Sequence, residues 1–93
     1  MITRLRNLRS TNMQGQRKIH VDLETNSPPD TAKLVITIAG CESTPEMDIP
    51  VNSAEITHEH SHSCQGGRIV TVKEMKSGLE TEKYLYLDAT QSS

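Results

Sequence analysis

The sequence predicts an all-β fold, namely a small antiparallel β-sandwich or barrel of five to six strands with a flexible basic N-terminal arm. Three observations lead to this prediction. Apolar and polar residues alternate over several short segments, as they do in half-buried strands. Glycine, proline and small polar residues separate these segments at short intervals. Outside the arm, where Ile2, Leu5 and Leu8 are spaced as on a helix, no helical period exceeds two turns.

The size of the chain limits its core. Its 93 residues suffice for one small domain, and they include no Phe or Trp. Leu, Ile and Val contribute 7, 7 and 5 residues. We expect residues 1–17 to form the basic arm, residues 18–89 a single β domain, and residues 90–93 a disordered tail. So modest a core predicts that a metal, a disulfide or a partner chain contributes to stability.

The first expected strands follow the arm. In residues 18–24, Ile19, Val21 and Leu23 alternate with polar side chains, which predicts a half-buried strand. A double proline then ends this strand. Residues 32–39 are the most hydrophobic run of the chain, and their β-branched content predicts a central strand covered on both faces.

The second half of the sequence predicts an edge strand and two hairpins. Residues 46–51 contain a proline that confines this strand to a sheet edge. Residues 54–64 form one long alternating segment. The turn sequence at 65–67 predicts a hairpin between this segment and a strand over 68–73. A further turn predicts that the same strand also pairs with residues 82–88.

Charge is distributed unevenly along the chain. Residues 1–21 carry a charge of +5 and the remainder carries −7, within a net charge of −2. A basic arm on an acidic body predicts docking on a protein partner, on a neighbouring copy, or non-specifically on nucleic-acid phosphates. The arm residues predicted to bind the partner are Arg4, Arg6, Arg9, Arg17 and Lys18.

The most distinctive motif is an alternating row of potential metal ligands, formed by His58, His60, His62 and Cys64. In an extended strand these side chains share one face. Their even numbers also place them on the face of Ala54 and Ile56. Partial burial there favours neutral imidazoles that can coordinate a metal. By the same parity, His20 belongs to a polar face.

Backbone spacing restricts how many of these ligands one ion can use. The ends of the histidine row are about 13 Å apart, so an ion can take one adjacent pair, with His60 and His62 favoured. Cys64 or Cys41 would complete the set. Such ligands suit Zn²⁺, with Cu, Ni or Fe as alternatives. An ion shared between copies, a solvated strand end without metal, and a Cys41–Cys64 disulfide are the other interpretations.

The sequence supports a general expectation about localisation. No run is long enough to span a membrane, and no segment resembles a secretory signal, so we expect an intracellular protein, cytoplasmic or, if viral, virion-associated. A mitochondrial presequence is a minor alternative. In a reducing compartment the cysteines are thiols or ligands rather than a disulfide.

The functional expectation is a non-enzymatic β-module. Enzyme motifs are absent, because Gly66-Gly67 lacks the flanking pattern of a phosphate-binding loop. We therefore expect a role in assembly or protein–protein interaction within a larger complex or particle, such as a phage or viral accessory protein. The alternative is a metal-binding protein that uses the row from His58 to Cys64.

Overall fold

The structure is a computed structural model that describes residues 1–64, 68–81 and 85–87. The prediction of an all-β fold with antiparallel strands is confirmed. The described residues contain no helix that is long and apolar enough to cross a membrane. They form eight strands: β1 (Ile2–Met13), β2 (Gln16–Thr25), β3 (Asp30–Ile38), β4 (Glu42–Ser43), β5 (Met47–Val51), β6 (Glu55–His62), β7 (Arg68–Glu74) and β8 (Leu85–Leu87).

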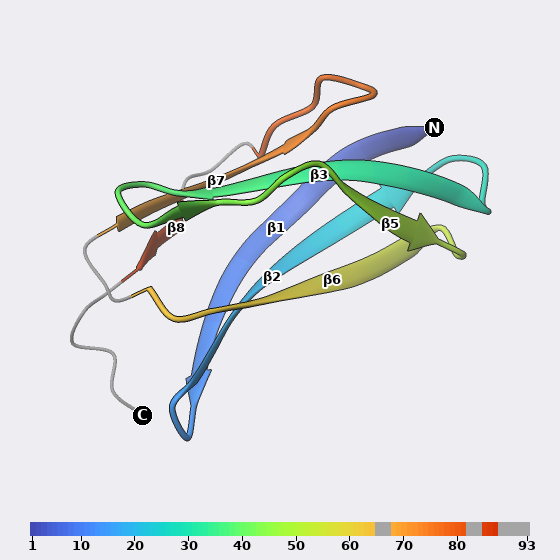
Figure 1. The fold of residues 1–93 in the computed structure, drawn as a ribbon. Helices are drawn as coiled ribbons and strands as arrows, with labels where there is room; N and C mark the ends of the chain where they lie inside the picture. The colour runs from blue at the N-terminus through green and yellow to red at the C-terminus, as the bar shows by residue number, and fades with distance from the viewer. Residues whose placement is uncertain (65–67, 82–84, 88–93) are drawn as a thin grey trace.

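The strands form two open sheets. One has three strands in the order β1-β2-β6, and the other has five, in which β3 pairs with β7 on one side and with β4 and β5 on the other, while β8 pairs with β7. Figure 1 shows β3, β5 and β7 passing across β1, β2 and β6. The sheets enclose the core between them.

Alternating burial builds this core from both sheets. Ile19, Val21 and Leu23 of β2 are fully buried, and the buried apolar residues that alternate along β3, β5 and β7 join them in one cluster. The central position of the strand expected at 32–39 is confirmed. Its predicted burial on both faces is wrong, because the intervening side chains of β3, such as Lys33 and Thr37, remain partly exposed.

The N-terminal residues differ from the expectation of a flexible arm. They form β1, which pairs with β2 across a turn at Gln14-Gly15, and Ile2 and Leu5 are buried in the core. The helix-like spacing from Ile2 to Leu8 has another cause. The register of β1 against β2 shifts between Ile2 and Arg4 and again between Leu5 and Leu8. A bulge places an extra residue in one strand, so side chains three apart can face the same side.

The partner of β6 also differs from the prediction. The predicted hairpin between β6, which carries the histidines, and β7 is not formed, so that prediction is wrong. β6 pairs with β2 along its length, while β7 pairs with β3 and β8. The predicted pairing of the last strand is confirmed at β8, where Leu87 lies opposite Arg68. The turn predicted at 65–67 and the tail at 90–93 lie outside the described residues.

Candidate functional site

The histidine row lies on one face of β6, as predicted from parity. His58, His60 and His62 are partly buried, whereas the residues between them are exposed. His58 lies opposite Val21 and His60 opposite Ile19, both of which are fully buried. The row therefore continues the buried face of the three-stranded sheet toward its edge.

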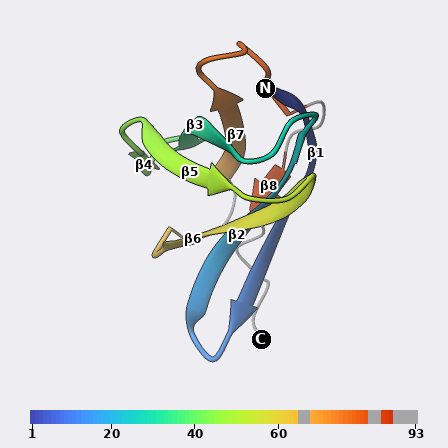
Figure 2. The ribbon, with the colours of Figure 1, turned by 90° about the vertical axis from the view of Figure 1, so that its right-hand side faces the viewer.

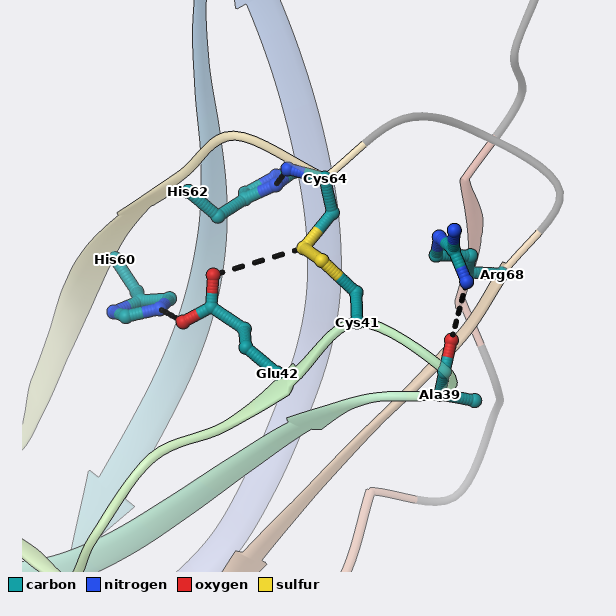
Figure 3. The surroundings of a disulfide bond; sticks show 7 residues. All are labelled: Ala39, Cys41, Glu42, His60, His62, Cys64 and Arg68. Carbon is teal, nitrogen blue, oxygen red and sulfur yellow. Dashed lines mark hydrogen bonds and ion pairs between the residues drawn. A yellow bond between two sulfur atoms is a disulfide. The ribbon is translucent and has the colours of Figure 1, made fainter.

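Cys41 and Cys64 form a disulfide, with an S–S distance of 2.03 Å. Cys41 lies in the turn after β3 and Cys64 lies just beyond β6, so the bond joins the two sheets (Figure 3). Cys64 is 3% exposed, and Cys41 is exposed. In this structure the two residues expected to be thiols or metal ligands are instead cross-linked to each other. The segment between the two cysteines contains β4 and β5 of the five-stranded sheet and β6 of the three-stranded sheet, and the disulfide joins its two ends.

Glu42, which the sequence analysis missed, lies between the disulfide and the histidine row. One carboxylate oxygen, Oε2, is 3.4 Å from Nε2 of His60, and the other, Oε1, is 3.6 Å from Sγ of Cys64 (Figure 3). A disulfide sulfur carries no proton, so the second approach is a contact and not a hydrogen bond. Glu42 and the two cysteines place their ligand atoms within 4.8 Å of one another.

The other two histidines of the row have a different environment. Burial lowers the pKa of His58 and His62, which favours the neutral form of both rings. Their Nε2 atoms are buried and have no hydrogen-bond partner among the described residues. Nδ1 of His62 accepts a hydrogen bond from the backbone N–H of Cys64 at 3.1 Å. That bond leaves the ring proton of neutral His62 on Nε2.

His20 lies on the outer face of the three-stranded sheet, as its parity predicted. Its Nε2 is 2.9 Å from the hydroxyl of Thr11, and its Nδ1 is 3.8 Å from the carboxylate of Glu59. Since the histidine row faces the opposite side of the same sheet, His20 is separated from the cluster around Glu42.

Most of the basic arm residues have acidic partners within the chain. Arg6 pairs with Glu24 and Glu55, Arg9 with Asp22, and Lys18 with Glu59, all across the outer face of the three-stranded sheet. The charge separation seen in the sequence is therefore largely compensated by antiparallel pairing of β1 with β2 and of β2 with β6. Within the described residues, Arg4 and Arg17 have no ion pair.

Asp22 connects all three strands of this face. It accepts hydrogen bonds from Thr57 at 2.6 Å and from Asn7 at 3.2 Å, and its carboxylate is 3.3 Å from Arg9. Burial opposes ionisation, but these partners outweigh it and lower the pKa of Asp22.

Replacement of Asp22 tests the energetic value of this connection. We expect Asp22→Asn to lower the free energy of unfolding by about 1 kcal/mol, because the site is partly screened by solvent. Asp48→Asn, which removes an exposed pair with Lys33, is the matched control and should cost clearly less than Asp22→Asn. Urea denaturation measures both, and equal losses would show that the shared position of Asp22 adds nothing.

Comparison with known proteins adds no assignment: no protein-family model matches the chain, and neither the curated proteins nor the solved structures give a significant match. Function must therefore be inferred from the geometry of the molecule itself. The described residues offer two features for this purpose, which are the disulfide cluster between the sheets and the long β1–β2 hairpin.

Proposed function

We propose that the chain is a small, non-enzymatic β-sandwich that acts in assembly, as a component of a larger complex or particle such as a phage or viral accessory protein. The observation that carries this proposal is the β1–β2 hairpin. No side chain from Arg6 to Lys18 is buried, although this range includes most of β1 and the first three residues of β2. The turn of the hairpin lies far from the five-stranded sheet in both ribbon views (Figures 1 and 2).

The shape of the molecule agrees with such a projection. Its principal extents are 40 × 23 × 21 Å. Met13, beside the turn, is 71% exposed. β6 covers the other side of β2 only as far as Arg17, so the turn end of the hairpin extends beyond the three-stranded sheet. A hairpin that extends beyond its own core gains stability when a second surface covers it. This supports a role in which the hairpin is completed by association.

The open edge of β6 supports the same proposal. Other sheet edges carry features that discourage pairing with a foreign strand: β1 has two register shifts, β5 contains Pro50, and β4 and β8 are very short. β6 is eight residues long, contains no Lys or Pro, and among the described strands pairs only with β2. Such an edge can accept a strand from another chain.

The charges favour a second copy of the chain as the partner. Near the hairpin turn a shallow hollow of about 480 Å³ is lined by Arg17 and Lys18, with His62 alongside. Glu46 and Glu80 are exposed acids outside the three-stranded sheet. Docking of the basic end of the hairpin against exposed acids such as these on a neighbouring molecule would pair opposite charges. The disulfide favours a virion-associated protein over a cytoplasmic one, because disulfides persist in oxidising surroundings.

Sedimentation of the purified protein over a wide concentration range tests the proposal. We expect reversible self-association that weakens with added salt. Arg17→Glu should lower the association constant at least tenfold, about 1.4 kcal/mol, because it reverses a charge in the hollow beside the hairpin turn. Arg4→Glu makes the same charge change at the end of β1 away from the hairpin turn, and it should leave association unchanged.

Two results would count against assembly through the hairpin. One is a monomer at every concentration whose melting temperature does not change on dilution. The other is an equal effect of both charge reversals, which would indicate a response to net charge alone. If the protein is instead a monomer that binds duplex DNA without sequence preference, and Arg17→Glu abolishes this binding, the hairpin contacts phosphates rather than a second copy.

A further inference from the structure

We propose that reduction of the Cys41–Cys64 disulfide converts the cluster between the sheets into a Zn²⁺ site whose four ligands are Cys41, Cys64, Glu42 and His60. The inference is independent of the assembly role proposed above. It differs from the row of ligands expected from the sequence in two ways. It uses a single histidine, and it includes a carboxylate from the opposite sheet.

Two of the distances in the cluster fall in the range expected between ligands of one tetrahedral ion. With Zn–S near 2.3 Å and Zn–N or Zn–O near 2.0 Å, two ligands lie about 3.3 to 3.8 Å apart. Glu42 Oε2 and His60 Nε2 are 3.4 Å apart, and Glu42 Oε1 and Cys64 Sγ are 3.6 Å apart. Glu42 therefore lies close to both neighbours, but through different oxygens, and His60 lies outside the group of Cys41, Glu42 and Cys64 whose ligand atoms are within 4.8 Å of one another. Metal binding therefore requires the side chains of Glu42 and His60 to turn toward the sulfur atoms.

Reduction frees the two sulfur atoms from each other. As thiolate ligands of one ion they would lie about 3.8 Å apart. Cys41 can take up this shift, because it is exposed and lies in the turn after β3, whereas Cys64 is buried. The turn includes Gly40, which has a positive φ of 73°. Figure 3 shows the Glu42 carboxylate between His60 on one side and the disulfide on the other.

The reaction balances with a dithiol as reductant. The dithiol gives two electrons and two protons to the disulfide, which becomes two thiols, while the dithiol closes into its own disulfide. Zn²⁺ then displaces the two thiol protons into solvent and binds two thiolates. Neutral His60 binds through Nε2 with its proton on Nδ1, and Glu42 supplies a carboxylate oxygen.

The neighbouring histidines are less suited as ligands. Nδ1 of His62 already accepts the backbone N–H of Cys64. His58 lies two residues before His60, about 6.6 Å farther along the strand. The consequence is a cross-link between the sheets in both redox states, a covalent bond when oxidised and a metal bridge when reduced.

Titration with Co²⁺, a spectroscopic probe for tetrahedral zinc sites, tests this proposal. The full chain is reduced with a phosphine, freed of reductant by anaerobic gel filtration and titrated. We expect one Co²⁺ per chain, with thiolate charge-transfer bands and tetrahedral d–d bands that one equivalent of Zn²⁺ abolishes. The oxidised protein should show neither band. Zn²⁺ should also raise the melting temperature of the reduced protein, which keeps the test informative if the reduced apoprotein is unfolded.

Matched variants distinguish this ligand set from simple binding to cysteines or histidines. Glu42→Gln and His60→Gln should each weaken Co²⁺ binding at least tenfold, whereas His58→Gln, on the same face of the same strand, should not change it. The proposal is overturned if the reduced protein binds no Co²⁺ and gains no stability from Zn²⁺. It is also overturned if oxidised protein binds equally well, or if His58→Gln and His60→Gln have equal effects.

Discussion

Reduction of the Cys41–Cys64 disulfide in the presence of a metal chelator should lower the free energy of unfolding by about 3 kcal/mol. The two cysteines are 23 residues apart in sequence, and the bond restricts the unfolded chain between them. Because domains of this kind are typically stable by only about 5 to 15 kcal/mol, the loss is a large part of the total. Urea denaturation of the oxidised and reduced protein, both with chelator, measures it.

The double variant Cys41→Ser, Cys64→Ser provides the control. It should have the stability of the reduced, metal-free protein and should respond to neither reductant nor Zn²⁺. An unchanged urea midpoint on reduction would contradict the prediction, as would titration of two free thiols in the folded protein before any reductant is added.

Local patterns in the sequence predicted most strands but not how they pair. Alternation located β2, β3, β5, β6 and β7, because burial of one face imposes a period of two on each strand. The turn residues at 65–67 suggested a hairpin between β6 and β7. Contacts distant in sequence favour β2 instead, since Thr57 and Glu59 of β6 meet Asp22 and Lys18 there. Such partners cannot be recognised from local spacing.

The N-terminal arm was misinterpreted for a related reason. Apolar residues three apart and a run of arginines resemble a tail or a short helix, whereas they lie on a bulged strand whose arginines pair with acids up to 49 residues away. Bulges depend on the partner strand. A charge imbalance in sequence therefore says little about the surface when antiparallel neighbours carry the opposite charge.

The candidate site was predicted in part. The shared face of the histidines follows from the period of a strand, and it was correct. Glu42 was missed because it is one acid among 12 and lies on a strand of two residues, β4. Its approach to His60 depends on how the two sheets face each other. The only local sign was its position next to Cys41.

A second large effect is expected at Glu74, which no sequence pattern singled out. Its carboxylate is fully buried at the end of β7 and accepts three hydrogen bonds of 2.7 Å, from the backbone N–H of Lys33 and from the N–H and hydroxyl of Ser77. It thereby joins β3 to the turn after β7.

Glu74→Gln keeps the size of the side chain, but its amide NH₂ must face a hydrogen-bond donor. The free energy of unfolding should therefore fall by about 2 to 3 kcal/mol. Urea denaturation measures this loss, and Glu80→Gln, an exposed change nearby, should cost less than about 0.5 kcal/mol.

The pH dependence of this loss identifies its electrostatic part. Burial would raise the pKa of Glu74, but hydrogen bonds from Ser77, Lys33 and Lys76 outweigh it and lower the pKa below its ordinary value. The unfolded chain therefore takes up a proton at higher pH than the folded one. The stabilisation is complete above the ordinary pKa of glutamate and is lost as the pH falls through the lower folded value. The difference between wild type and Glu74→Gln should thus shrink as the solution is acidified, and a constant difference would show that shape alone explains the cost.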